Sequence, residues 1–430
     1  MNLRFILSAF LILAFTSGFA QIPNIRIGPD KVSGYQPCEP SIAISPVNPN
    51  IMVAGSILDN VYRSEDGGVT WSHDQLTSSH GVFGDPCVVA SPLGDFYYLH
   101  LSDPEGQGWR SDKLLDRIVC QHSIDGGKTW SDGGGMGLHH PKDQDKEWAV
   151  VSQDGHTIHA CWTQFDKYDS RLEEDSTTIL CSFSDRGGEI WSEPVRVSER
   201  AGNCLDSDLT TEGAVPAIGH DGTVYVAWAL DETIWFDRSE DGGQTWLDHD
   251  IKATTIVGGW DQSVDAIGRV NGMPVTCVDH CKSSNNYGRI YINWTDARNG
   301  EDDLDVFICY SDDGGFTWSD AKRVNDDEEG SQQFFTWMTV DPKNGGIHIV
   351  FYDRRAHDDA HTDVYVASSF DGAQTWTNRL ASQSSFLPKG RVFFGDYNNI
   401  SAVDGHIRPI WTREDNGKLT VWTALLELVK

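Results

Sequence analysis

The sequence has few positive charges. Its 430 residues include 33 lysines and arginines against 64 aspartates and glutamates, which gives a formal net charge of −31. Nucleic acids and anionic membrane surfaces both require a basic protein face, so this balance argues against either as a partner. A local group of arginines could still hold a small anionic ligand.

Long apolar runs are also missing after the first 20 residues. Arg4, the apolar run from Phe5 to Phe15 and the small-x-small sequence Gly18-Phe19-Ala20 predict a secretory signal peptide cleaved near Ala20. The run is too short to span a membrane, and no later stretch is apolar enough to insert. We therefore expect a secreted or periplasmic protein whose mature chain is residues 21–430.

The cysteines are not spaced as in a zinc site. There are nine of them, so at least one stays unpaired if the others form disulfides. Cys161 and Cys181 are expected on neighbouring strands, and Cys277 with Cys281 could close a short loop. The sequence establishes neither pairing, and buried free thiols are the alternative.

Glycine and tryptophan are abundant, with 42 and 16 residues, and both belong to a repeated motif. The motif is Ser-x-Asp-Gly-Gly-x-Thr-Trp, and its six copies occupy residues 64–71, 123–130, 184–191, 239–246, 311–318 and 369–376. The third copy has Arg186 and Ile190 in place of aspartate and threonine. Each copy follows an alternating apolar run, which predicts a hairpin turn. There the carboxylate and hydroxyl can bond turn amides, and a glycine can adopt positive φ.

This motif resembles the Asp box, or BNR repeat, of sialidase-like β-propellers, and the resemblance covers nearly all of the mature chain. In those families the box lies away from the active face. The resemblance therefore implies a fold, and the chemistry has to be sought elsewhere in the chain.

The spacing of the boxes predicts the number of blades. Their closing tryptophans are 55 to 72 residues apart, more than the roughly 40 to 50 residues that a four-stranded blade needs, so the surplus lies in loops. Two further strands precede each box. The inner ones are expected at 39–45, 85–90, 147–152, 212–218, 274–278 and 335–340.

Residues after the sixth box add another blade. An inner, a middle and a third strand are expected at 396–403, 406–412 and 418–426, without a box. The short strand 25–27 could pair with 418–426 and close the ring, which removes an exposed edge. The sequence thus predicts an all-β, single-domain, seven-bladed β-propeller with six Asp boxes, closed by an N-terminal strand that completes the last blade. That is one blade more than the sialidase catalytic domain has.

The candidate functional residues lie where inner strands begin and middle strands end, because these points share one face of a propeller. The acidic candidates are Glu39, Asp85, Glu212 and Asp396; the others are Lys146, Tyr397, Arg298, Arg354, Arg355 and Arg391. The arginines could clamp a carboxylate or sulfate of a substrate. They could instead pair with nearby aspartates, as Arg298 with Asp296 or Arg354 with Asp353. The carboxylates could likewise be structural caps around the channel.

The resemblance to sialidases implies specific roles. Those enzymes use a tyrosine nucleophile paired with a glutamate, an aspartate as acid/base and three arginines around the sugar carboxylate. Tyr397 (or Tyr352) would be the nucleophile, Glu212 or Glu39 its partner and Asp85 the acid/base. Arg298, Arg354 and Arg391 would form the clamp.

The sequence therefore favours a monomeric, secreted glycoside hydrolase that acts on an acidic oligosaccharide or polysaccharide, with exo-sialidase activity as the leading expectation. One alternative is elimination on uronic-acid glycans, with His139, His140 or Tyr397 as base. The other is a propeller that only binds a glycan or a protein. No cofactor or catalytic metal is expected. The acidic loop 299–305 is either solvated or a structural calcium site.

Overall fold

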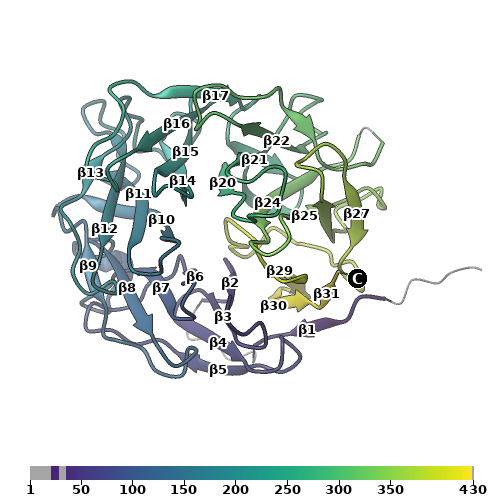
Figure 1. The fold of residues 1–430 in the computed structure, drawn as a ribbon, viewed down its shortest axis with the longest axis horizontal. Helices are drawn as coiled ribbons and strands as arrows, with labels where there is room; N and C mark the ends of the chain where they lie inside the picture. Colours follow the sequence, from purple (N-terminus) through teal and green to yellow (C-terminus); the bar gives the residue numbers. More distant parts are fainter. Residues whose placement is uncertain (1–20, 29–34, 329, 429–430) are drawn as a thin grey trace, which may run out of the picture.

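The computed structural model describes residues 21–28, 35–328 and 330–428, which form one ring of seven β-sheets around a central axis (Figure 1). Each blade has an inner, a second, a third and an outer strand joined in antiparallel order. The seven-bladed architecture predicted from the repeat is confirmed.

The strands of each blade follow one another along the chain. The inner strands are β2 (Ser41–Ile44), β6 (Cys87–Ala90), β10 (Asp143–Val151), β14 (Glu212–Ile218), β20 (Val275–Val278), β24 (Gln333–Val340) and β28 (Asn399–Val403). The second strands are β3 (Met52–Ser56), β7 (Phe96–Leu101), β11 (Ile158–Phe165), β15 (Val224–Leu230), β21 (Ile290–Asp296), β25 (Ile347–Asp353) and β29 (His406–Asp415). The third strands are β4 (Asn60–Ser64), β8 (Ile118–Ser123), β12 (Thr177–Ser184), β16 (Thr233–Ser239), β22 (Asp305–Ser311), β26 (Asp363–Ser369) and β30 (Lys418–Ala424).

The outer strands are short. They are β5 (Ser72–Gln75), β9 (Gly134–Met136), β13 (Val195–Arg196), β17 (Ile251–Thr255), β23 (Lys322–Arg323), β27 (Thr377–Leu380) and, in the last blade, β1 (Asn24–Arg26). The blades are supplemented by β31 (Leu426–Glu427), which pairs with β29, and by a 3-10 turn at Gly108–Arg110.

The N-terminal strand closes the ring as predicted. β1 runs antiparallel to β30, with Ile25 opposite Thr423 and Arg26 opposite Trp422. The two ends of the chain's colour range lie side by side at this blade in Figure 1. Ile27 follows β1 and is buried between the first and last blades. The last blade therefore takes its outer strand from the other end of the chain.

The Asp boxes form the turns between third and outer strands. In the fifth copy, both carboxylate oxygens of Asp313 accept bonds: the Thr317 amide and hydroxyl donate at 2.9 and 2.6 Å, and the Ser311 hydroxyl at 2.8 Å. The Trp318 indole donates to the Gly315 carbonyl at 3.0 Å. Gly315 has a φ of +92°, and a side chain there would collide with the Phe236 ring of the preceding blade. The predicted role of the box in folding is confirmed.

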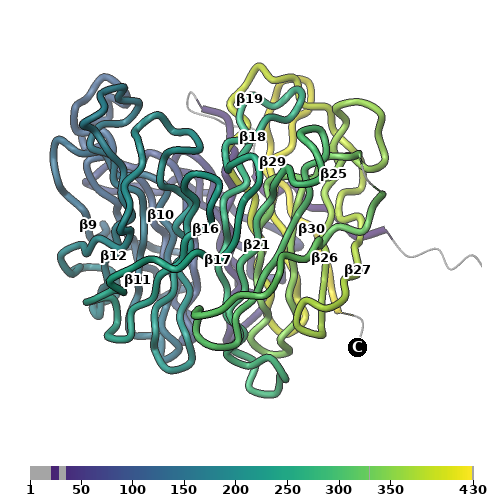
Figure 2. Tube along the Cα trace, turned by 90° about the horizontal axis from the view of Figure 1, so that it is seen from above, coloured from purple at the N-terminus to yellow at the C-terminus, as the bar shows by residue number. Residues whose placement is uncertain are grey.

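One hairpin lies outside the blades. β18 (Asp261–Val264) and β19 (Ile267–Asn271) pair with each other between the fourth and fifth blades. Figure 2 shows this hairpin projecting at the face of the ring from which the inner strands start. It occupies the longest gap between two boxes, the 72 residues that separate Trp246 from Trp318.

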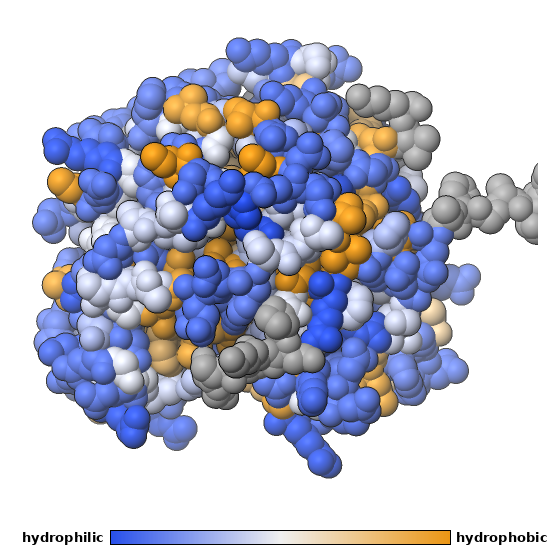
Figure 3. Space-filling view, turned by 90° about the horizontal axis from the view of Figure 1, so that it is seen from below, coloured by the Kyte–Doolittle hydropathy of each residue, from blue (hydrophilic) through white to orange (hydrophobic). Residues whose placement is uncertain are grey.

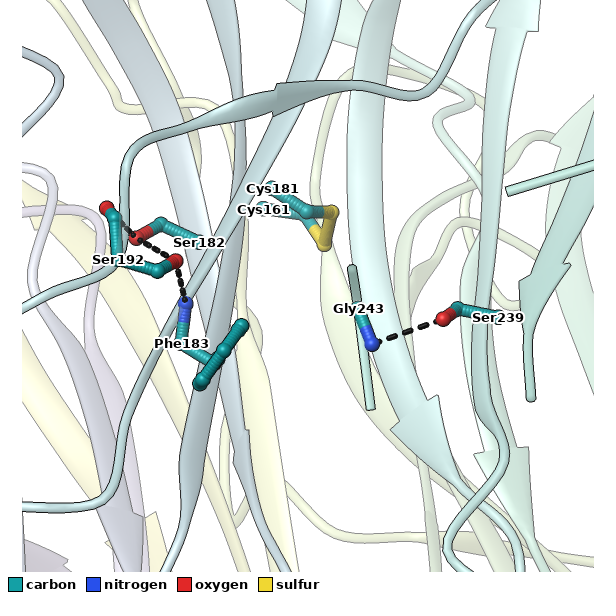
Figure 4. The surroundings of a disulfide bond; sticks show 7 residues. All are labelled: Cys161, Cys181, Ser182, Phe183, Ser192, Ser239 and Gly243. Carbon is teal, nitrogen blue, oxygen red and sulfur yellow. Dashed lines mark hydrogen bonds between the residues drawn. A yellow bond between two sulfur atoms is a disulfide. The ribbon is translucent and has the colours of Figure 1, made fainter. Parts of the chain in front are cut away.

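Cys161 and Cys181 form a disulfide. They face each other across β11 and β12 with a Cα–Cα distance of 4.1 Å. Figure 4 shows the bridge beside the hydrogen bonds that join Ser182 of β12 to Ser192 in the β12–β13 connection, with Gly243 of the fourth Asp box nearby. The other seven cysteines are free thiols, so Cys277 and Cys281 do not close a loop.

The outside of the molecule agrees with its acidic composition. The side seen in Figure 3 is mostly hydrophilic, and its apolar residues form scattered small patches. No helix in the part of the chain that the structure describes has the length and apolarity to cross a bilayer. The predicted signal peptide, residues 1–20, lies outside the described residues, and export stays a prediction.

Candidate functional site

A cavity of about 260 Å³ lies at the start of the inner strands of the first, second, third and last blades. Its wall contains Tyr35, Glu39, Ile57, Leu58, Phe83, Asp85, Leu101, Trp109, Leu115, Asp145, Lys146, Tyr168, Arg269, Phe393 and Asp396. Four of the residues predicted from the sequence, Glu39, Asp85, Lys146 and Asp396, therefore meet in one place.

Three of these residues have the same unusual backbone conformation. Glu39, Asp85 and Lys146 have φ values of +53°, +48° and +56°. They occupy equivalent places in three consecutive blades, each two residues before the first paired residue of the straight part of the inner strand. A left-handed conformation costs a residue other than glycine roughly 1–2 kcal/mol. Gly213 and Phe335 have the same conformation at the equivalent places of the fourth and sixth blades, so it belongs to the start of the repeated inner strand.

Lys146 is the centre of an ion-pair network. Its ammonium lies 2.9 Å from Asp396, 3.4 Å from Asp85 and 3.9 Å from Asp145, and its side chain is buried. Arg269, on β19, lies 2.8 Å from the second oxygen of Asp396. Since these groups come from four separate parts of the ring, the network fixes their positions relative to one another.

The β18–β19 hairpin adds a second arm to this network. Arg269 also contacts Asp206 at 2.5 Å, and the Tyr168 hydroxyl donates to Asp206 at 2.7 Å. Burial opposes the charge of Arg269, but Asp396 and Asp206 raise its pKa. The guanidinium therefore stays charged and ties the hairpin to two blades.

Neighbouring carboxyl groups in the cavity have opposite pKa shifts. Burial, followed by the charges of Asp85 and Asp396, raises the pKa of Glu39 well above its usual range. Burial also raises the pKa of Asp145, to about 7. For Asp396, Arg269 and Lys146 overcome the effect of burial and lower the pKa. The cavity thus holds an acid whose surroundings favour the protonated form, Glu39, beside one whose surroundings favour ionisation, Asp396.

Glu212 and Glu147 lie close to the network and outside the cavity wall. Both side chains are buried, and their carboxyl oxygens have no hydrogen-bond partner among the described residues. Burial is the main cause of the raised pKa of each. No tyrosine hydroxyl of the described chain is therefore bonded to Glu212, which the sequence predicted as the partner of the nucleophile.

Tyr397 is packed in the channel and is not part of the cavity wall. Its ring contacts Trp148 and Trp337, with centroids 4.9 and 6.1 Å away, and its hydroxyl donates to the Pro86 carbonyl at 3.4 Å. Burial and the nearby carboxylates of Asp85 and Glu39 raise its pKa. Tyr352 is also buried, with its hydroxyl bonded to the Thr412 carbonyl.

Arg298 and Arg355 are held by aspartates of the protein. Arg298 contacts Asp296 at 2.5 Å and lies over the Phe307 ring. Arg355 contacts Asp353 at 2.7 Å and Asp326 at 2.5 Å. Of the two alternative pairings, Arg298 with Asp296 is formed, whereas Asp353 pairs with Arg355 and not with Arg354.

Among the described residues, Arg354 and Arg391 form no ion pair like those of Arg298 and Arg355, and neither is part of the wall of the 260 Å³ cavity. Arg354 is buried and donates to the neutral acceptors Thr362, Gln332 and the Asp265 carbonyl, so burial lowers its pKa to about 10. It lines a second cavity of about 580 Å³. Arg391 is exposed and has no ion-pair partner in the described chain. None of Arg298, Arg354, Arg355 and Arg391 is part of the wall of the 260 Å³ cavity.

Several residues of the site were missed in the sequence. Trp109 and Tyr168 lie on loops that follow second strands. These loops belong to the face on which the sequence predicts functional residues. Arg269 lies in the segment between the fourth and fifth boxes, whose unusual length was a signal of an insertion. The sequence does not show that this insertion reaches the cavity, because its contacts with Asp206 and Asp396 are remote in the chain.

The arrangement offers acid–base chemistry on a ligand held by aromatic rings. Aromatic side chains at the mouth can stack on the apolar face of a sugar, and an acid beside an ionised carboxylate can transfer a proton. No group of three or more histidine, cysteine or acidic side chains in residues 21–28, 35–328 and 330–428 is arranged to hold a metal ion.

The sequence matches no family model and no curated protein. Among solved structures, a protein of unknown function from Dyadobacter fermentans superposes with a TM-score of 0.51 at 14% identity, over 95% of this chain and 99% of that one. A Hadza microbial sialidase superposes with a TM-score of 0.50 at 15% identity, over 87% of this chain and 73% of that one. Likeness at this level of identity concerns the fold. Together with its six Asp boxes, it gives this chain the fold of the sialidase-like Asp-box β-propellers.

Proposed function

We propose that this protein is a glycoside hydrolase that binds a sugar in the 260 Å³ cavity and cleaves its glycosidic bond with carboxyl groups of the cavity wall. One arrangement carries the proposal: the carboxyl groups of Glu39, Asp85 and Asp396 meet in one cavity wall, where burial favours the protonated form of Glu39 while Arg269 and Lys146 favour the ionised form of Asp396. Pairs of acids whose pKa values are pushed apart are typical of glycosidases.

Each residue then has a role that follows from its contacts. Glu39 is the acid that protonates the leaving oxygen, and Asp85 is the base that activates the attacking water. Lys146 touches Asp85 and Asp396 and positions both. The rings of Trp109, exposed by 61%, and Phe393, exposed by 50%, hold the sugar at the mouth.

The sialidase-type reaction on an acidic glycan is the second candidate, because the fold is shared with a sialidase. Arg354 favours it, since a buried guanidinium without a carboxylate partner is suited to an anion. However, Arg354 lines the other cavity, away from Glu39 and Asp85. The substrate panel described next therefore includes neutral, basic and acidic sugars.

The proposal is tested with a panel of fluorogenic aryl glycosides that includes neutral sugars, amino sugars, uronic acids and sialic acid. We expect hydrolysis of at least one member. Glu39→Gln and Asp85→Asn should each lower kcat/KM for that member at least about 100-fold, the range expected for a lost acid or base. Elimination on a uronic-acid polymer would instead give a product that absorbs in the ultraviolet.

Glu65→Gln is the matched control, because Glu65 is an exposed carboxylate in the first Asp box. It should leave kcat/KM unchanged. Hydrolysis that survives both cavity substitutions contradicts the assignment of Glu39 and Asp85. Retention on a glycan column without turnover of any glycoside contradicts the hydrolase and leaves a binding propeller.

A further inference from the structure

The cavity has more carboxyl groups than cations. Four acids line its wall, Glu39, Asp85, Asp145 and Asp396, and only Lys146 and Arg269 balance them. Both cations are already shared, Lys146 by three of these acids and Arg269 by Asp396 and by Asp206 outside the wall. With all four acids ionised, the wall would therefore carry more negative than positive charge.

Glu39 is the acid for which the protein supplies no cation. It lines the cavity with 2% of its surface exposed, and its one hydrogen bond is accepted from the Asp396 amide at 3.2 Å. No lysine or arginine of the described chain forms an ion pair with it. Without a cation this buried acid stays protonated, and the acidic wall leaves a place for a positively charged group of a ligand.

Aromatic rings surround the mouth of the same cavity. Phe83 makes edge contacts with Tyr35 and Trp109, and Trp109 contacts Tyr168, with ring centroids 5.6 to 6.2 Å apart. Tyr35 and Trp109 are exposed by 43% and 61%, although aromatic rings usually bury their faces. The faces of such rings attract cations, with tryptophan the strongest.

We propose that the cavity binds an organic cation, and that in the substrate this cation is the free ammonium group of an amino sugar. The ammonium lies against the acidic wall under the Trp109 ring, while Glu39 and Asp85 keep the catalytic roles proposed above. This inference rests on the proposed hydrolase for the sugar, while binding of the cation itself does not depend on hydrolysis.

Two other occupants fit the cavity less well. An acidic sugar would face an excess of carboxylates and would have to displace Asp396 from Lys146 or Arg269. A metal ion needs several ligands around one point, and the described residues contain no such group. The raised pKa of Asp145 supports a cation, because a nearby positive charge would relieve the cost of ionising this carboxyl group.

The test measures binding of three probes by titration calorimetry with the whole mature chain: glucosamine, N-acetylglucosamine and tetramethylammonium chloride, with sodium chloride at equal ionic strength as reference. We expect glucosamine to bind about tenfold more tightly than its N-acetyl derivative, which has the same ring without the charge. Tetramethylammonium should bind and should compete with glucosamine.

Trp109→Ala should weaken the binding of glucosamine and of tetramethylammonium about tenfold. The binding of N-acetylglucosamine should weaken less. Trp109 is exposed on a loop, so its removal should leave the unfolding temperature unchanged. Phe370→Ala is the matched control, an equally exposed aromatic at the sixth Asp box. It should leave the binding of all three probes unchanged.

Equal affinity for glucosamine and N-acetylglucosamine, or no binding of either cation, overturns the inference. If a neutral glycoside is nevertheless hydrolysed and Glu39→Gln abolishes that hydrolysis, the proposed hydrolase stands and only the cation site fails. If the cations bind and no glycoside is cleaved, the cation site stands and the hydrolase fails.

Discussion

At the scale of the residue, the third Asp box is a natural comparison for the others. Arg186 stands where the other boxes have an aspartate, and the bonds from threonine to that aspartate are lost. The Trp191 indole still donates to the Gly188 carbonyl, and the Ser184 hydroxyl still accepts from the Gly188 amide. The serine, glycine and tryptophan thus suffice for the turn, and the aspartate adds stability to it.

Replacing Asp313 by alanine should therefore lower the free energy of unfolding by about 1–2 kcal/mol, because it removes three hydrogen bonds of the fifth box. Denaturant titration measures this. Arg186→Ala in the third box is the control and should change the free energy by less than about 0.5 kcal/mol. A loss as large for Arg186→Ala as for Asp313→Ala would show that the aspartate bonds do not stabilise the turn.

Asp145 should make stability depend on pH. Its pKa rises from 3.8 in the unfolded chain to about 7 in the folded protein, because burial disfavours its charge. The folded protein then binds more protons than the unfolded chain between these values. This contribution to stability is fully present below about pH 4 and is lost as the pH rises through 7.

In Asp145→Asn this contribution disappears. The free energy of unfolding of the variant, measured by denaturant titration from pH 4 to 8, should rise relative to that of the wild type as the pH increases. A constant difference across this range would contradict the raised pKa. Asp185→Asn, at an exposed aspartate, is the control and should show no such trend.

Tyr397→Phe separates two assignments of the catalytic residues. If Tyr397 were the nucleophile, removing its hydroxyl would abolish activity. Because this hydroxyl donates to the Pro86 carbonyl and lies outside the cavity wall, we expect kcat/KM on the preferred glycoside to stay within about threefold of the wild type. A loss of 100-fold or more, with an unchanged unfolding temperature, would favour the sialidase-type nucleophile.

At the scale of the element, the β11–β12 hairpin is the part of the ring with a covalent link. The disulfide joins residues 20 apart, and closing a loop of this size stabilises a protein by about 3 kcal/mol in the chain-entropy model.

A reducing agent should therefore lower the free energy of unfolding by about 2–4 kcal/mol, measured by denaturant titration with and without dithiothreitol. The double variant Cys161→Ala/Cys181→Ala should be less stable than the oxidised wild type. Its stability should not respond to the reagent, since the seven remaining thiols are already free. The same response in the variant and the wild type would contradict the disulfide.

At the scale of the whole molecule, the ring closure links the two ends of the described chain. Deleting residues 21–28 would remove β1 and leave the edge of β30 exposed. We expect a lower unfolding temperature and concentration-dependent light scattering, because a free strand edge pairs with other chains. Pro23→Ala is the control, because Pro23 is exposed and its backbone carbonyl, which accepts from the Leu425 amide, is kept. An unchanged unfolding temperature after the deletion would contradict closure by β1.

Features repeated along the chain were predictable, because each depends on residues within one hairpin or at a fixed place in each blade. The Asp boxes are of the first kind. Glu39, Asp85 and Lys146 each occupy a fixed place in a blade, since the start of every inner strand faces the same axis. Their meeting in one cavity follows from the symmetry of the ring.

Features that depend on a choice between partners were not predictable. Whether Asp353 would pair with Arg354 or Arg355 depends on the direction of two adjacent side chains. The direction of the Tyr397 hydroxyl depends on packing between Trp148 and Trp337. Such choices are made by contacts remote in the chain, and they decided which candidates form the site.

The sequence by itself determined the blades, their number and the face that carries function, because hairpin turns and strand periodicity are local properties. The tertiary structure alone decided that Arg269 reaches across the ring to Asp396, that four predicted arginines lie elsewhere and that Glu39 has no cation of its own. The physical reason is that ion pairs and burial depend on which side chains meet in space, and this is settled only when the ring closes.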